Sequence, residues 1–387
     1  MKSRYSVPIA VTVVLAIVAA VALLFLRKGK PSPEQLAPVK YVSDIIGDPA
    51  SAEYNLVASY AEKSSDGAIY VLGDTSRSNL LATAIMECDE YDNVDGSSDP
   101  DWLKDFAGES ICTLANFEDF TTLAGTDENR MRELTVRNAI SAMDTLCYVS
   151  PYDRSGMGKK PGAKVLVLAS PQMVQFGRYD LDTLFHALGC KLPVISSTDL
   201  MLDEVFGRFS DKQILTIGVL TGADSCASGI YESLIREKAL NSDLDSARCV
   251  CFAVPEGEEA LTSFLDYYSE FADGRPVDAL IVDDILLNPA DITASLKRVT
   301  SVMNAESMTY GNLISNDFVV IGPASLTCRA IFGYLRNNNL LPISYPNQNV
   351  MIICCFPRKE AREAIFCSHI MNVTYLPIID VPNHYKP

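Results

Sequence analysis

The segment Ile214 to Leu240, ILTIGVLTGADSCASGIYESLIREKAL, constrains the fold more than any other part of the chain. A run of apolar residues ends at Thr221-Gly222, and apolar residues then recur at helical spacing. This pattern predicts a buried strand, a tight turn and the start of a helix. Open α/β sheets place such a unit beside a ligand-binding crevice.

Strand-like and helix-like segments alternate along most of the chain. Apolar, β-branched runs predict strands at residues 68–72, 111–114, 145–149, 164–169, 192–195, 214–220, 248–254, 277–282, 318–321, 341–344 and 350–356. Amphipathic segments, such as 128–143, separate most of these runs. The alternation predicts an α/β fold with parallel, doubly wound sheets.

Two segments of the chain resemble each other. Residues 163–196 and 316–344 both read as strand, small residue plus proline, helix, Leu-Pro and strand. Such similarity predicts two similar lobes. We expect lobe 1 at 67–200, lobe 2 at 201–345 and a C-terminal return segment at 346–387 that packs on lobe 1, with crossings near 197–212 and 345–350.

The N-terminal region carries an uncharged apolar run, Val7 to Leu26, of about the twenty residues that cross a bilayer. It predicts a signal anchor, a single transmembrane helix within residues 1–28; a cleaved signal peptide is the competing interpretation. Prolines in the following residues 29–66 predict a stiff tether, which contains one helical patch near 52–63. We therefore expect membrane attachment through Val7 to Leu26, with the globular part extracytoplasmic, in the periplasm.

Composition narrows the possible partners. The formal net charge of −17 disfavours binding to nucleic acid, which depends on clustered Lys and Arg. The chain has eleven cysteines but three histidines, and neither Cys249-Val250-Cys251 nor Cys354-Cys355 matches a zinc spacing. No glycine-rich phosphate motif is present. We therefore expect no metal, no cofactor and no nucleic acid.

Candidate ligand-binding residues follow the predicted strands, because ligands of doubly wound sheets bind outside the carboxyl ends of the strands. The polar residues at these places are Asp74, Ser76, Arg77, Asp153, Gln172, Asp224, Ser225, Asp283 and Ser325. They suit a small polar solute, although Asp and Ser at such places also cap helices. Of the adjacent Asp283 and Asp284, only one is expected to reach the cleft. No catalytic residue is assigned.

The order of elements resembles the type 1 periplasmic binding proteins. The resemblance covers residues 68–344 and rests on IGVLTGADSCASGIYESLIREKAL and on VDALIVDDILLNPADITASL, Val277 to Leu296. It implies ligand contact at Asp283 or Asp284 and a cleft bordered by the helix that begins near Ser225. The expected function is a membrane-anchored receptor for a small polar solute, with a transporter or sensor as a possible partner.

The same region also resembles the aspartate/glutamate racemases, which are likewise built from two similar lobes. That resemblance implies a cysteine at a strand end of each lobe, acting as acid and base on opposite faces of an amino acid. The corresponding places hold Ser170-Pro171 and Pro323-Ala324, with Cys226 and Cys328 nearby. A racemase-like enzyme is therefore the alternative to the favoured solute receptor.

Overall fold

The computed structural model describes residues 37–93, 95–116, 119–148, 157–242, 244–284, 287–301, 309–342, 349–355 and 370–372. Met1–Pro38 and Val39–Pro387 form separate units. The apolar run Val7 to Leu26 lies outside the described residues. Within the described residues, no helix has both the length and the apolar character needed to cross a membrane.

The first sheet has six strands in the described part of the chain, in the order β12-β11-β2-β1-β5-β6. Neighbouring strands are parallel except for the β11–β12 pair. The bounds are β1 Ala68–Asp74, β2 Ser110–Asn116, β5 Ala163–Leu168, β6 Val194–Ser196, β11 Asn349–Cys355 and β12 Ile370–Asn372. The strand β11, late in the chain, thus extends a sheet formed mainly by the first half.

The second sheet contains four described strands, all parallel, in the order β10-β9-β7-β8. Their bounds are β7 Ile214–Leu220, β8 Ser246–Phe252, β9 Val277–Val282 and β10 Ile314–Ile321. The central β9 is buried at every position. Its sequence VDALIV is apolar except for Asp278, as expected for a strand of a parallel sheet with helices on both faces.

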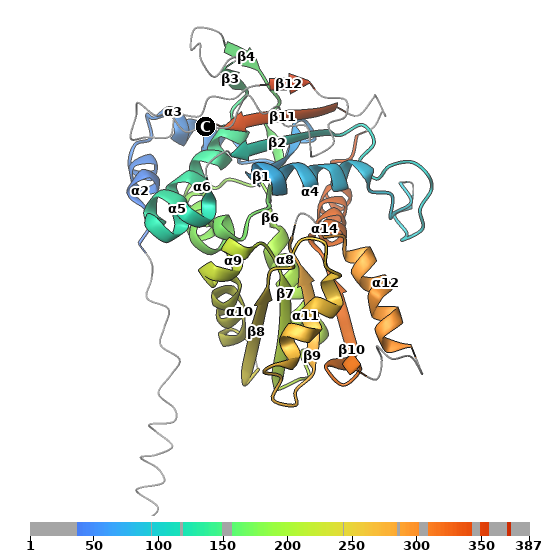
Figure 1. The fold of residues 1–387 in the computed structure, drawn as a ribbon. Coiled ribbons are helices and arrows are strands. Elements are labelled where there is room, and N and C mark those ends of the chain that lie inside the picture. Colours follow the sequence, from blue (N-terminus) through green and yellow to red (C-terminus); the bar gives the residue numbers. More distant parts are fainter. Residues whose placement is uncertain are drawn as a thin grey trace, which may run out of the picture. The chain divides into compact units, whose positions relative to one another are not determined.

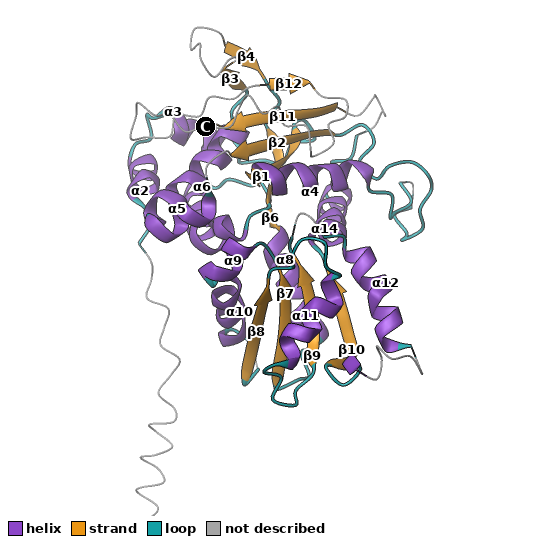
Figure 2. Ribbon diagram, in the orientation of Figure 1, coloured by secondary structure: helices purple, strands orange, loops and turns teal. Residues whose placement is uncertain are grey.

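Helices cover both faces of the six-stranded sheet (Figure 2). Ile69 and Val71 of β1 face α4 and α14, whereas Tyr70 and Leu72 face the opposite helix layer. This division follows from the two-residue period of a strand. The helices of the two layers are α4 Thr75–Glu87 and α14 Pro323–Asn337 on one face, and α2 Lys40–Gly47, α3 Ala52–Ser59, α5 Phe120–Thr126, α6 Glu128–Met143 and α7 Arg178–Leu188 on the other.

The four-stranded sheet is likewise enclosed (Figure 1). One face packs on α8 Ser197–Arg208 and α10 Ile230–Leu240, and the other on α11 Ala260–Ser269 and α12 Pro289–Thr300. The short helix α9 Ala223–Ser228 links β7 to α10, the π-helix η1 Met173–Gly177 precedes α7, and β3 Leu146–Tyr148 pairs antiparallel with β4 Met157–Lys159. The predicted α/β class with parallel sheets is confirmed.

The segment expected to be a tether differs from that expectation in its described part. Residues 40–59 carry α2 and α3, and Val42, Ile45 and Val57 are buried in the core. The backbone N–H of Val39 donates a hydrogen bond to the buried Asp180 carboxylate at 2.7 Å. Apolar residues three apart in α2 lie on one helix face, so this segment packs instead of spacing the chain.

The glycine in the middle of β7 provides a test of the packing in the second sheet. A Cβ atom at Gly218 would lie 2.5 Å from Phe264 Cζ and 2.7 Å from Leu280 Cδ1. Gly218→Ala should therefore lower the free energy of unfolding by about 1–3 kcal/mol through overpacking. Urea denaturation measures the change. Gly207→Ala in α8, where no atom lies within 4 Å of the added Cβ, should leave stability unchanged or slightly raised, and equal stability of the two variants would contradict this packing.

Candidate functional site

Loops that follow strands of both sheets meet around Arg77, in the first turn of α4. The Arg77 guanidinium forms an ion pair with the Asp283 carboxylate, which follows β9 of the other sheet. Its Nη1 also donates to the Asp283 carbonyl oxygen at 3.1 Å, and its Nη2 donates to Thr221 Oγ1, after β7, at 3.4 Å. Asp74, at the end of β1, accepts a hydrogen bond from the Arg77 backbone N–H and lies 3.4 Å from Arg77 Nε. One arginine thus connects the carboxyl ends of β1, β7 and β9.

The ion pair is shielded from water. The Arg77 side chain is 14% exposed and that of Asp283 7%. Burial raises the pKa of the Asp283 carboxyl above its usual value, and the adjacent Arg77 guanidinium opposes this rise. The phenol of Tyr231 is fully buried nearby, and burial together with the Asp283 charge raises its pKa as well. A guanidinium keeps its charge in a protein, so Arg77 depends on Asp283 for neutralisation in this setting.

A polar pocket of about 250 Å³ opens beside this ion pair, and we call it the strand-end pocket. Its wall comes from loops that follow β1, β2, β5, β7 and β9. The polar residues that line it are Asp74, Ser76, Arg77, Asp119, Thr121, Gln172, Asp224, Ser225 and Asp284. The carboxyl-end position is the one that ligands occupy in doubly wound sheets.

Carboxylates dominate the charge of the strand-end pocket. Asp74 and Asp119 come from the six-stranded sheet, and Asp224 and Asp284 come from the four-stranded sheet, whereas Arg77 is the cation among the described lining residues. Asp119 caps α5 through the N–H groups of Thr121 and Thr122. Hydrogen bonding from Thr122 lowers the pKa of Asp119 and keeps it ionised. The pocket therefore favours a ligand that carries positive charge.

A second pocket of about 390 Å³ adjoins the first and is mainly apolar. Arg77 and Asp284 line both pockets, and Asp283 lines the apolar one. The apolar wall includes Leu80, Leu81, Ala84, Val282, Leu287, Pro289 and Pro323. A ligand with an apolar extension could reach from the carboxylates into this space.

The structure brings together most of the predicted ligand-binding residues but gives some of them other partners. Asp74, Ser76, Arg77, Gln172, Asp224 and Ser225 line the strand-end pocket. Gln172 is nevertheless buried, accepting from Ser170 Oγ at 2.7 Å and donating to Thr121 Oγ1 at 2.9 Å. Ser325 is exposed on α14 and donates to Glu90 Oε2 at 2.9 Å, away from both pockets. Asp153 lies outside the described residues.

Sequence analysis missed part of the acidic wall. Asp119 and Thr121 follow β2 after two further residues, and nothing in the local pattern separates them from an ordinary helix cap. Asp284 was weighed against Asp283 because neighbouring residues of an extended chain point in opposite directions. In the structure Asp283 pairs with Arg77, whereas Asp284 lines the strand-end pocket. Successive residues of an extended chain face opposite sides, so the position of β9 in the sheet determines which of the two aspartates faces the strand-end pocket.

The two cysteines considered for racemase chemistry do not line the strand-end pocket. Cys226 on α9 contacts the thiol of Cys251 on β8. Cys328 on α14 is buried in the helix layer of the six-stranded sheet, beside Cys88. Ser170, one of the corresponding strand-end positions, is completely buried. Among the described residues, therefore, no thiol lines the strand-end pocket.

Comparison with known proteins returned similar structures only. No protein-family model and no curated protein sequence matches the chain. A glutamate racemase from Francisella tularensis subsp. tularensis SCHU S4 in complex with D-glutamate has 13% identity and a TM-score of 0.47, covering 80% of this chain and 98% of its own. A glutamate racemase isoform from Bacillus anthracis has 14% identity and a TM-score of 0.40, covering 75% and 88%. An aspartate racemase homologue from Pyrococcus horikoshii OT3 has 13% identity and a TM-score of 0.36, covering 70% and 99%.

These findings correct the function expected from the sequence. The structures named above are amino-acid racemases, so the comparison does not return the solute receptor that the sequence predicted, and that expectation is corrected. Asp284 and Ser225, which the type 1 binding-protein resemblance placed at the cleft, line the strand-end pocket.

Removal of one partner of the ion pair should be costly. Asp283→Ala leaves the Arg77 charge buried without its partner, so the free energy of unfolding should fall by about 3–5 kcal/mol. The double variant Arg77→Met/Asp283→Leu removes both charges and should lie much closer to the wild type. Urea denaturation of the three proteins gives both values. An Asp283→Ala variant as stable as the wild type would mean that the pair contributes nothing to folding.

Proposed function

We propose that this chain is an enzyme that moves a proton at a carbon atom of a small amino-acid-like substrate, with carboxylates in place of thiols. The observation that carries the proposal is the strand-end pocket, whose wall takes ionisable carboxylates from both sheets. The two sheets act in this proposal as two lobes that enclose one substrate. It develops the racemase-like alternative recognised in the sequence.

The pocket supplies the groups that such a reaction needs. Asp119 on the side of the six-stranded sheet is ionised, since hydrogen bonding from Thr122 lowers its pKa, and in this proposal it is the carboxylate that takes the proton. Asp284 enters the pocket from the four-stranded sheet. A base on one face removes the proton bound to the substrate carbon, the electron pair stays on that carbon, and an acid on the other face returns a proton. Positioned acid–base groups of this kind contribute about 10²–10⁴-fold to a rate.

The charge of the pocket suggests which substrates it accepts. The ammonium group of an amino acid is attracted by Asp74 and Asp224, while Arg77, the cation among the described lining residues, is already paired with Asp283. An acidic side chain would add a further negative charge to this wall. The proposal therefore favours a neutral or basic amino acid, with the adjoining pocket for an apolar side chain.

Exchange of the carbon-bound proton with solvent tests the proposal directly. The full chain, incubated in deuterium oxide with single enantiomers of neutral, basic and acidic amino acids, should replace the α-proton of a neutral or basic one, as followed by proton nuclear magnetic resonance. Asp284→Asn should slow this exchange by about 100-fold or more, because the acid–base group is lost.

A matched carboxylate provides the control for this experiment. Asp66 is exposed and does not line the strand-end pocket, so Asp66→Asn should exchange at the wild-type rate. Absence of exchange for every amino acid with the wild-type chain would rule out the proposed reaction. Equal rates for Asp284→Asn and the wild type would rule out the role given to Asp284.

A further inference from the structure

A second group of reactive side chains lies on the outer strand of the four-stranded sheet. Cys249 and Cys251 belong to β8, which is an edge of this sheet among the described strands. They are two residues apart and therefore point to the same face. Val250 between them points to the other face and is buried in the core beneath α11. The Cys-Val-Cys spacing thus presents two thiols side by side toward α10.

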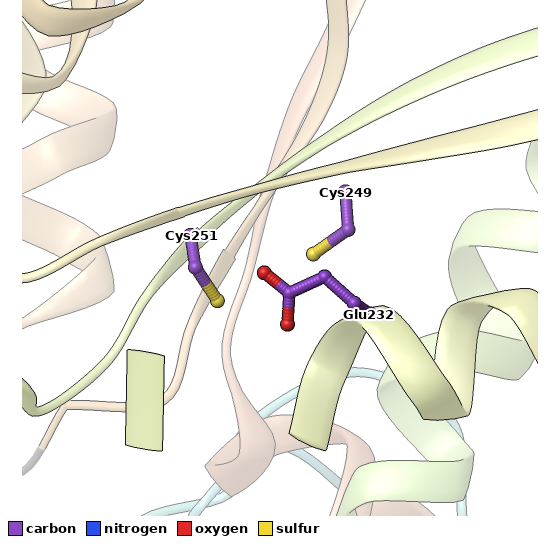
Figure 3. A group of neighbouring side chains, drawn as sticks. All are labelled: Glu232, Cys249 and Cys251. Atoms are coloured by element: carbon purple, nitrogen blue, oxygen red, sulfur yellow. The ribbon is translucent and has the colours of Figure 1, made fainter. Parts of the chain in front are cut away.

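The helix opposite supplies a carboxylate to the same place. Glu232 lies in the first turn of α10, and Figure 3 shows its carboxylate between the two sulfur atoms. One oxygen of Glu232 and the sulfur atoms of Cys249 and Cys251 all lie within 4.8 Å of one another. The thiol of Cys226, on α9, contacts Cys251 and adds a third sulfur. These side chains converge from two helices and one strand.

The carboxylate lacks partners within this setting. Glu232 Oε2 is buried and, among the described residues, has no hydrogen-bond partner. An ionised oxygen removed from water without compensation is costly. A cation bound between Glu232 and the two sulfur atoms would compensate this charge.

We propose a binding site for a divalent cation of the zinc class, with four ligands: Cys226, Glu232, Cys249 and Cys251. Zinc binds thiolate sulfur at about 2.3 Å and carboxylate oxygen at about 2.0–2.2 Å in tetrahedral geometry, which sets ligand atoms about 3.5–4 Å apart. The observed spread of up to 4.8 Å among Glu232, Cys249 and Cys251 requires movements of about 1 Å or less for these three ligands, and Cys226 joins them through its contact with Cys251. Thiolates alone would also suit monovalent copper, and the carboxylate oxygen favours zinc over it.

The position of the site gives the cation a structural consequence. Cys226 follows Asp224 and Ser225, which line the strand-end pocket. A cation held by Cys226, by Glu232 of α10 and by β8 would fasten the short helix α9 to the sheet edge. It would thereby fix one wall of the pocket without touching the ligand.

Cobalt binding provides a spectroscopic test on the full chain. After treatment with a reductant and a chelator, titration with Co²⁺ alone should give one equivalent of thiolate-to-cobalt charge-transfer absorption, and Zn²⁺ should displace it. Proton release should accompany binding, because the thiols must ionise. Cys226→Ser, Cys249→Ser, Cys251→Ser and Glu232→Gln should each weaken Co²⁺ binding about tenfold or more, as expected for loss of one ligand bond.

Cys190 supplies the matched control, because it is a partly buried free cysteine that lies near Tyr60 and is not part of the group formed by Glu232, Cys249 and Cys251. Cys190→Ser should leave the cobalt spectrum and affinity unchanged. Circular dichroism of the metal-free variants confirms that each is folded. The proposal is overturned if Cys249→Ser and Cys251→Ser bind Co²⁺ as the wild type does, or if the wild-type thiols bind no Co²⁺ and instead oxidise to a disulfide between Cys226 and Cys251.

Discussion

The buried ion pair between Arg77 and Asp283 holds together the ends of strands from two separate sheets. Arg77 belongs to the helix that follows β1, and Asp283 follows β9, so the contact fixes how α4 meets the second sheet. Replacing both partners of such a pair by apolar side chains costs little stability. Removing one partner is costly, because it leaves a buried charge without compensation. The strand-end pocket and the apolar pocket both include Arg77 in their walls, so both depend on this contact.

The bounds of individual strands and helices could be predicted closely, because the spacing of apolar residues within a short segment determines them. The strands β7 and β9 and the helix α6 begin and end at the predicted residues. Their apolar periodicities are unambiguous, and β9 is fully buried as its continuous apolar run requires. The sequence predicts a helix at 326–336, and α14 begins three residues earlier, at Pro323, because proline is favoured in the first helical turn.

Long-range features could not be predicted in the same way. The helix α14 follows β10 of the four-stranded sheet but packs on α4 and the six-stranded sheet, and no local pattern encodes this exchange. Strand-end polarity correctly indicated where polar residues gather, since Asp74, Asp224 and Ser225 do line one pocket. It could not indicate that Asp283 is neutralised by Arg77, because their 206-residue separation appears only after folding.

The cysteine cluster could not be predicted from the sequence either, because its residues come together only after folding. Zinc motifs are recognised in sequence when ligands lie on one short loop, and Cys249-Val250-Cys251 alone matches none of these spacings. On a strand, however, alternate residues share a face, so this spacing aligns two thiols toward whatever packs there. What packs there is α10, whose Glu232 carboxylate lies between the sulfur atoms (Figure 3). The short helix α9 carries both Cys226, which contacts Cys251, and the pocket residues Asp224 and Ser225, so the cysteine cluster and the strand-end pocket share one helix.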